Sequence, residues 1–278
     1  MILAKLLFPF FCSAFILKPA TVVQKLVENS GSGIYQIEDE VQFSSSNPAL
    51  QEALTLRETW LIENEGKMRL TVNGTKELAS KIHWVFVYEN GQRYFLGPQG
   101  KSTQVLGDDF LEKYHHFRKA DRFELALERM KVAPASIFAK RPFKMGKDPD
   151  VVSDPHVHLA RVGGVVSIAI GLPADVGAEL NPEFFIEQDQ FVLRKFRLPS
   201  QVEVVSENFS AFPRGLNFPR HRTVRWTDKA QQVSIQTLHV QSKSEKTLAL
   251  NLEPSMSMDV PELGASKSLV EEFYKRFR

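Results

Sequence analysis

Two histidines at alternate positions are the residues whose type and spacing best suit chemistry. His156 and His158 flank Val157. Alternate residues on a strand point to one face of a sheet, so two imidazoles placed there could share a metal ion. The pair follows Asp154–Pro155, which is typical of a loop, and no third ligand is evident in the sequence. A metal-dependent enzyme that uses His156 and His158 is therefore the last of three functional hypotheses.

The adjacent histidines and the common catalytic motifs give less evidence for a metal or catalytic site. His115 and His116 fall in a predicted helix about 100° apart, so they cannot comfortably face one ion. We interpret them as surface or rim residues. The sequence has no G-x-S-x-G elbow, no G-x-x-x-x-G-K-[ST] loop and no H-E-x-x-H pair. These patterns predict a protein that is not an enzyme and that needs no cofactor or metal.

A set of aromatic and large aliphatic side chains is more informative. Most of them alternate along predicted strands, so they are expected on one face of a curved sheet. They form a filled core if helices cover that face completely, or the wall of an apolar ligand cavity if the helices act as a partial lid. Both interpretations are retained. The candidate ligand-binding residues are Trp60, Met68, Leu70, Trp84, Phe86, Phe95, Phe110, Phe117, Phe191, Leu193, Trp226 and Ile235.

Alternation with a period of two predicts the strands that position these side chains. Asn64–Gly66 and Asn90–Gly91 mark tight turns, and the second is a strong hairpin signal. Short turns favour antiparallel pairing, and a sheet of about ten strands is large enough to curl. The predicted fold class is mainly β, or α+β. Strands are expected in 35–43, 54–62, 68–72, 82–88, 93–96, 157–170, 183–186, 190–198, 201–208, 222–226 and 233–240.

Helical spacing of apolar residues predicts three helical regions. The first spans 21–29, and the second runs from Phe110 to Met130 with a break near Ala120. The third spans 268–278, where Ser268 and Glu271 have the spacing of a capping box. Residues 97–107 are predicted to form a loop, and 140–154 an exposed connector.

The first twenty residues predict a secretory signal peptide. A short head is followed by an apolar run from Leu6 to Leu17, which is too short to span a bilayer. Cleavage after Ala14 or after Ala20 fits, and an uncleaved anchor is the alternative. We divide the chain into a signal peptide, 1–20, and a single domain, 21–278.

Composition restricts the partners of the exported chain. Cys12 is the only cysteine, so removal of the leader leaves neither a disulfide nor thiol chemistry. The same cleavage removes Lys5 and Lys18, after which basic and acidic residues are equal in number. A balanced charge gives no reason to expect a nucleic-acid partner.

Several stretches together resemble the outer-membrane lipoprotein-sorting (LolA-like) superfamily. Arg57-Glu58-Thr59-Trp60-Leu61-Ile62, followed by 66–72, is similar to the early strands of that group. The runs 163–171, 185–193 and 218–223 are similar to its late strand order. The resemblance covers residues 21 to 245.

The resemblance implies a half-barrel sheet with helices covering its concave side, and an apolar cavity for lipid or lipoprotein acyl chains. It also implies a periplasmic location in a Gram-negative bacterium and partners among inner- or outer-membrane envelope proteins. The helices near 108–131 would then form part of a lid. Arg57 and Arg69 match equally well the arginine that holds the lid in the carrier.

Our leading hypothesis is a non-enzymatic lipid-binding or carrier protein, and the second is an envelope structural or interaction protein with a filled core. Within the 140–154 connector, Lys140, Arg141 and Lys144 either meet lipid phosphates or belong to a solvated loop.

Overall fold

The computed structural model describes residues 17–45, 54–139, 154–173, 180–226 and 231–278. Most of the predicted leader lies outside these ranges, although Pro19 and Ala20 begin helix α1 (Pro19–Glu28). Lys140, Arg141 and Lys144 of the predicted connector also lie outside the described residues. No helix in the described ranges is long and apolar enough to cross a membrane.

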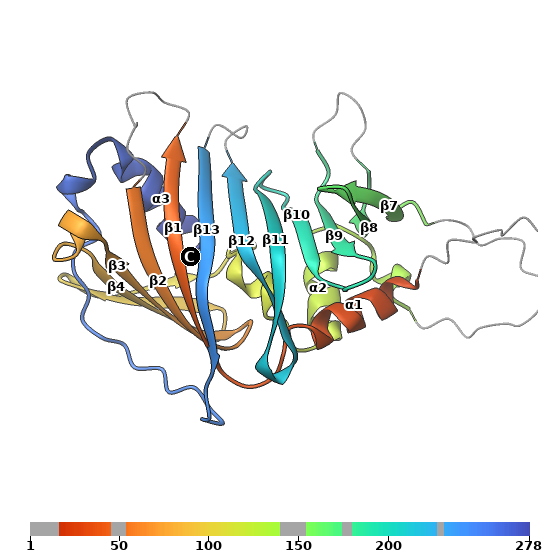
Figure 1. Ribbon diagram of the computed structural model, residues 1–278, viewed down its shortest axis with the longest axis horizontal. Coiled ribbons are helices and arrows are strands. Elements are labelled where there is room, and N and C mark those ends of the chain that lie inside the picture. The colour runs from red at the N-terminus through yellow and green to blue at the C-terminus, as the bar shows by residue number, and fades with distance from the viewer. Residues whose placement is uncertain (1–16, 46–53, 140–153, 174–179, 227–230) are drawn as a thin grey trace, which may run out of the picture.

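One antiparallel sheet of thirteen strands dominates the described residues (Figure 1). Its order is β6-β5-β4-β3-β2-β1-β13-β12-β11-β10-β9-β8-β7, so every neighbouring pair except β1 and β13 is consecutive in the chain. The sheet is not closed, and Figure 1 shows it strongly curved with α2 and α3 on the concave side. The predicted curved antiparallel sheet with helices on one face is confirmed. The strands are β1 (Tyr35–Ser45), β2 (Leu54–Asn64), β3 (Lys67–Gly74), β4 (His83–Glu89), β5 (Gln92–Gly97), β6 (Gly100–Val105), β7 (Val157–Val162), β8 (Val165–Gly171), β9 (Glu183–Glu187), β10 (Leu193–Arg197), β11 (Glu203–Phe212), β12 (Leu216–Trp226) and β13 (Gln231–Ser242).

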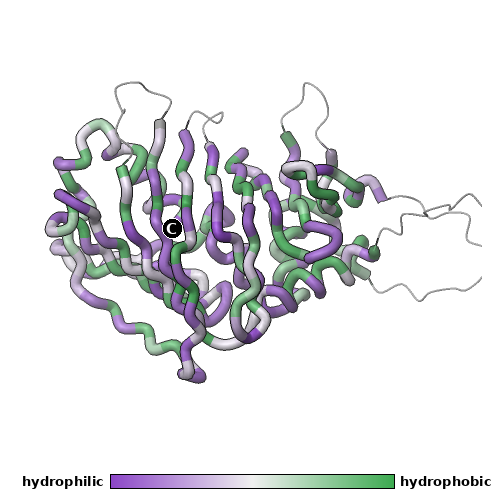
Figure 2. Tube along the Cα trace, viewed as in Figure 1, coloured by the Kyte–Doolittle hydropathy of each residue, from purple (hydrophilic) through white to green (hydrophobic). Residues whose placement is uncertain are grey.

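Alternation and turn chemistry explain the early strands. In β2 and β3, every second side chain is buried, as a strand with one face on the core requires, and Figure 2 shows apolar and polar residues alternating along the strands. Asn90 and Gly91 have φ angles of 54° and 74°, the left-handed pair that a two-residue hairpin needs, and they join β4 to β5 as predicted.

Three helices and several 3₁₀ turns supply the rest of the core. α1 and α3 (Lys267–Arg276) lie within two residues of their predicted bounds, and α2 spans Ala120–Arg129. Helix α3 begins at Lys267, so the predicted capping box at Ser268 is wrong. The 3₁₀ turns are η2 (Lys76–Leu78), η3 (Glu112–His115), η4 (Ala135–Ile137), η5 (Pro213–Gly215) and η6 (Pro261–Ser266).

Other local predictions are corrected by the structure. The helix predicted from Phe110 begins only at Ala120, because 110–119 enters the core as irregular chain around η3. The predicted loop 97–107 contains the exposed edge strand β6. The predicted strand 157–170 is the hairpin β7–β8, since Gly163 and Gly164 both have positive φ and turn the chain.

Candidate functional site

The structure gathers the twelve predicted ligand-binding residues into one apolar core. Ten of them are buried, and Phe95 and Phe191 are partly buried. Trp60, Met68 and Leu70 come from β2 and β3, and Trp226 and Ile235 come from β12 and β13. Phe110 and Phe117 flank η3 in residues 108–131, which we call the covering segment. The side chains that lie on strands therefore reach the same core, which is the arrangement that the alternation predicted.

Side chains of the helices fill much of this face. Tyr274 of α3 lies 5.3 Å from the Trp84 ring, and the Phe277 ring lies 4.8 Å from that of Trp226, measured between ring centroids. In the covering segment, Phe110 stacks on Tyr88 at 4.8 Å. The concave face is thus packed rather than open in this state.

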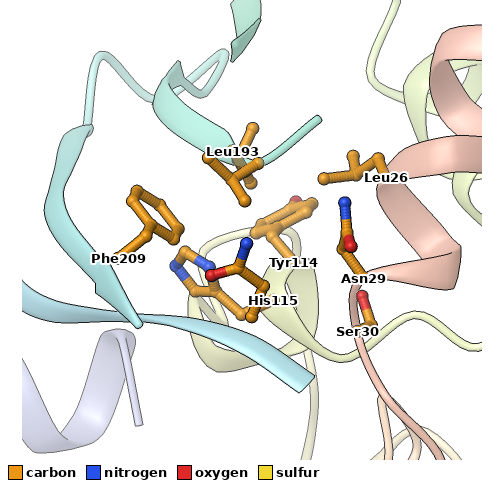
Figure 3. Close-up of a pocket in the computed structure, with 9 residues that line it drawn as sticks. Leu26, Asn29, Ser30, Tyr114, His115, Leu193 and Phe209 are labelled. Atoms are coloured by element: carbon orange, nitrogen blue, oxygen red, sulfur yellow. The ribbon is translucent and has the colours of Figure 1, made fainter. Parts of the chain in front are cut away.

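A cavity of about 10 Å³ lies where the end of α1 meets η3 and β10 (Figure 3). Leu26, Asn29, Tyr114, His115 and Leu193 are among the residues that line it. This volume is close to the smallest that holds one water molecule. An acyl chain can enter this part of the core only if covering side chains move.

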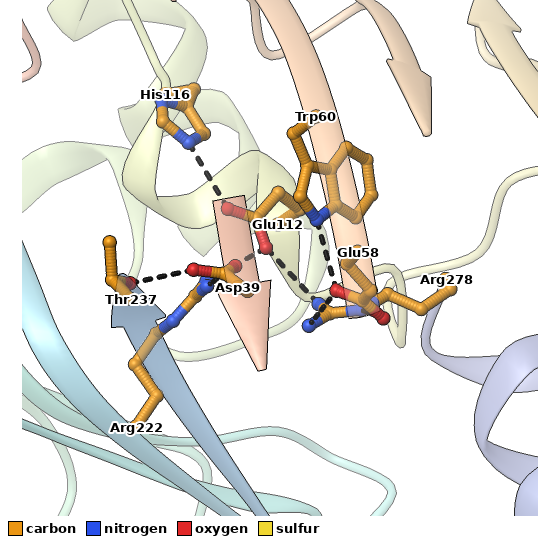
Figure 4. Close-up of polar contacts among 8 residues, drawn as sticks. All are labelled: Asp39, Glu58, Trp60, Glu112, His116, Arg222, Thr237 and Arg278. Carbon is orange, nitrogen blue, oxygen red and sulfur yellow. Dashed lines mark hydrogen bonds and ion pairs between the residues drawn. The ribbon is translucent and has the colours of Figure 1, made fainter. Parts of the chain in front are cut away.

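A network of buried charges crosses the concave face (Figure 4). We call it the core ion network. Its members come from β1, β2, η3, β12 and the end of the chain, and each is at most 2% exposed. They are Asp39, Glu58, Glu112, Arg222 and Arg278.

Arg222 joins the sheet to the covering segment. Its guanidinium donates to Asp39 Oδ2 at 2.5 Å and to Glu112 Oε2 at 2.8 Å. Thr237 Oγ1 donates to the other oxygen of Asp39 at 2.7 Å. Since Glu112 belongs to η3, these bonds hold the covering segment on β1 and β12.

Arg278 extends the same network to the C-terminal helix. Its Nη1 lies 3.1 Å from Glu112 Oε2, and its Nε donates to Glu58 Oε1 at 3.1 Å. Trp60 Nε1 donates to Glu58 Oε2 at 3.0 Å. The covering segment and α3 are therefore tied to the sheet and to each other by shared carboxylates.

The low dielectric of the core and the neighbouring charges shift the pKa values of two of these acids. Burial raises the pKa of Asp39 to about 6, although Arg222 opposes the shift. Burial also disfavours the charged form of Glu112, but Arg222, the His116 hydrogen bond and Arg278 outweigh it and hold the pKa of Glu112 well below its usual range. Glu112 is thus the anionic centre of the network.

Sequence reasoning did not find the core ion network, although a signal was present. Asp39 lies in phase with Ile37 and Val41 along β1, and Glu58 lies in phase with Leu56 and Trp60 along β2. An acid at an apolar position of an alternating strand indicates a buried partner of opposite charge.

His115 and His116 were predicted to lie at the surface, and the structure shows this to be wrong. They are 8% and 0% exposed because the covering segment enters the core instead of continuing as an amphipathic surface helix. His116 stacks on Phe218 with ring centroids 5.4 Å apart, and one of its ring nitrogens lies 3.2 Å from Glu112. Burial, with Arg222 second, lowers the pKa of His115 to about 3.

Lowering the pH is expected to destabilise the protein through His115. Between about pH 6.5, the usual pKa, and pH 3, the unfolded chain binds a proton at this residue and the folded chain does not. The contribution of His115 is present above pH 6.5 and is lost as the pH falls. Relative to His115→Gln, the wild type should lose about 2 kcal/mol of unfolding free energy from pH 7 to pH 5, measured by urea denaturation. The other titrating groups are common to both proteins, so a difference that stays constant with pH would contradict this assignment.

Comparisons with known proteins bear on the fold. No family model matches the sequence, and no curated protein matches it significantly. A LolA superfamily protein from Nitrosomonas europaea superposes with a TM-score of 0.50 over 83% of this chain and 96% of that one, at 10% identity. The chain has the LolA fold.

Two further solved structures align at TM-scores of 0.47. A domain from Vibrio parahaemolyticus, named for outer membrane lipoprotein sorting, has 9% identity, and a DUF1329 family protein from Desulfovibrio piger has 6%. Each alignment covers 81% of this chain and 92% of the other. The likeness in the sequence is confirmed at the level of the fold by the Nitrosomonas europaea structure.

Within this LolA-like fold, the arginines that hold the covering segment are not Arg57 or Arg69, the two candidates from the sequence. Arg57 lies 3.9 Å from Glu40 and its side chain is 61% exposed, and Arg69 pairs with Glu253 at 2.8 Å. Arg222 and Arg278 instead reach Glu112 inside the core.

The structure places His156 and His158 beside different carboxylates. His156 Nδ1 lies 3.0 Å from Asp154 Oδ1, and His158 Nε2 lies 3.0 Å from Glu183 Oε1. Among the described residues, no group of three or more His, Cys, Asp or Glu side chains is arranged to hold a metal ion. The two histidines are not brought together at one metal-binding position.

Proposed function

We propose that this protein is a non-enzymatic periplasmic carrier that binds lipid or the acyl chains of a lipoprotein at the concave face of its sheet. The arrangement of apolar side chains on that face, and of the elements that cover them, supports the proposal. Large apolar side chains line this face on both sides of the β1–β13 pair. The covering segment and α3, which lie over these side chains, are not hydrogen-bonded into the strand ladder. The covering segment and α3 can therefore move away while the thirteen strands stay paired.

Apolar burial supplies the driving force for such binding. Each methylene taken from water contributes about 0.8 kcal/mol, so a chain of roughly sixteen carbons gains on the order of 10 kcal/mol. Binding requires this gain to exceed the free-energy cost of exposing the side chains that the ligand displaces. Envelope proteins of the inner or outer membrane would load and receive the ligand.

A second candidate is an envelope interaction protein with a permanently filled core. The packing favours it, because ten of the twelve candidate residues are buried and the cavity beside η3 measures only about 10 Å³. In this case the function would lie in contacts made by the outer surface or by the sheet edges.

The test is native mass spectrometry of the full chain, expressed in a Gram-negative host and purified gently from its periplasm. A reproducible added mass that lipid extraction releases supports the carrier. A bare polypeptide that also takes up neither phospholipid nor an acylated peptide excludes the carrier and leaves the interaction protein.

Tryptophan quenching separates ligand at the concave face from lipid on the surface. All three tryptophans of the chain, Trp60, Trp84 and Trp226, are buried on this face. An acyl chain that carries bromine quenches tryptophan on contact, so bound ligand should quench most of the emission. A chain that binds without quenching is on the outer surface and contradicts the proposed site.

A further inference from the structure

We infer that residues 267–278, which we call the C-terminal segment, occupy the ligand's place in the closed protein, and that the ligand that displaces them is an amphiphile with a cationic group. The inference rests on the proposed function and names the class of ligand for the same face. It follows from what the segment buries, how it is attached and which charge it carries.

The C-terminal segment is built like an amphiphile. Leu269, Val270, Phe273, Tyr274 and Phe277 are at most 3% exposed and form its apolar part. Their rings contact the sheet at three places, with centroid distances of 5.4 Å from Phe273 to Phe43, 5.3 Å from Tyr274 to Trp84 and 4.8 Å from Phe277 to Trp226. The segment thus lies across β1, β4 and β12, where an acyl chain would have to lie.

The attachment of this segment leaves the sheet independent of it. The chain from 243 to 260 has little regular structure and makes an isolated bridge between Pro254 and Leu96. Backbone carbonyls of the segment accept hydrogen bonds from the Arg93 guanidinium and from Leu111 N–H. No pair of strands in the ladder includes a residue of 267–278. Its departure breaks side-chain contacts, the ion pairs that Arg276 and Arg278 make with Asp109, Glu58 and Glu112, and these hydrogen bonds, but no strand pairing.

Arg278 gives the segment a cationic group in a defined place. Its guanidinium lies between the carboxylates of Glu58 and Glu112 and 5.3 Å from the Trp60 ring. Two carboxylates and an indole face are the surroundings that also suit an ammonium group. The same position can therefore receive the cationic group of a ligand.

Charge balance decides which ligand can replace the segment. Asp39, Glu58 and Glu112 pair with two guanidiniums, those of Arg222 and Arg278, while Arg93 donates to backbone carbonyls of the segment. Tyr88 and the His116 ring add no charge when neutral, and burial lowers the pKa of His116. Removal of Arg278 takes its guanidinium away from Glu58 and leaves Glu112 with the guanidinium of Arg222, and a buried carboxylate that loses its cation is costly in a medium of low dielectric. A cationic group of the ligand can take the position between Glu58 and Glu112, whereas an anionic group placed there is repelled by both carboxylates.

The experiment compares three amphiphiles with the same twelve-carbon chain, each below its micelle concentration. Dodecylammonium is cationic, dodecanoate is anionic and dodecyl maltoside is uncharged. We measure their affinity for the full chain by calorimetry, and hydrogen exchange in 267–278 by mass spectrometry. Dodecylammonium should bind at least 10-fold more tightly than dodecanoate, and its binding should accelerate exchange in 267–278.

Two variants locate the origin of the charge preference. Glu58→Gln removes a carboxylate beside Arg278 and should reduce the ratio of the two affinities several-fold. Glu128→Gln removes an exposed carboxylate on α2 and should leave the ratio unchanged. An equal loss in both variants would show that the preference comes from general surface charge, and would overturn the inference.

The outcomes separate this inference from the function on which it rests. If none of the three amphiphiles binds, the proposed function fails together with the inference. If they bind with equal affinity, or if exchange in 267–278 does not change, the protein still binds acyl chains but the inference is wrong.

Discussion

Replacement of Arg222 by Met is expected to lower the free energy of unfolding by about 3 to 5 kcal/mol. The substitution removes the guanidinium that lies 2.5 Å from Asp39 and 2.8 Å from Glu112, and it leaves both carboxylates in a core that water does not reach. The loss should be larger at pH 8 than at pH 5, because the stranded carboxylates can be neutralised by protons at the lower pH. Urea denaturation at both pH values measures the effect.

Arg57→Met is the matched control for this substitution. Arg57 makes an exposed pair with Glu40 at 3.9 Å, and such pairs contribute about 0 to 1 kcal/mol. If Arg222→Met costs no more than this control, the core ion network does not hold the covering segment on the sheet.

Leu127→Ala is expected to cost about 2 to 5 kcal/mol of unfolding free energy. Leu127 is fully buried on the inner face of α2, so the shorter side chain loses apolar burial and leaves a cavity in the core. Thermal or urea unfolding monitored by circular dichroism measures the change.

The same helix supplies the control, because Leu125 is 64% exposed two residues earlier. Leu125→Ala makes the same chemical change in the same helix, and should shift the free energy by no more than about 0.5 kcal/mol. Similar effects of the two substitutions would mean that α2 does not pack on the sheet through the face described.

Much of the sheet could be predicted because its signals are local. The alternation in 54–62 and 68–72 and the Asn90–Gly91 turn depend on neighbouring residues, and the structure follows them. The β7–β8 hairpin was missed although Gly163–Gly164 is a turn signal, because apolar residues on both sides of it suggested one continuous strand. The edge strand β6 was missed because its side chains are polar and exposed on both faces, so they carry no alternation.

The candidate site could be predicted only in its apolar part. Trp60 and Trp84 follow the alternation of their strands. The partners of Asp39 and Glu58 come from residues far away in sequence, Arg222 and Arg278, and no local pattern indicates that such groups meet. His115 and His116 were misplaced for a related reason, because helical spacing in 110–130 continued through a stretch that tertiary packing holds in an irregular conformation.

The pairing of β1 with β13 sets the order in which this chain can fold. On each side of the β1–β13 pair, every strand pairs with its neighbour in sequence, from β1 to β6 on one side and from β7 to β13 on the other. We call these two sets of strands wings, and each wing can form from local hairpins. The seam between the wings joins Tyr35 to Ser242, about 200 residues apart, and such distant contacts close slowly because the loop entropy must be overcome first. Until β13 has been made and has docked, β1 presents an unpaired edge that can pair with another chain. A chain with this topology therefore depends on the arrival of β13 to protect β1.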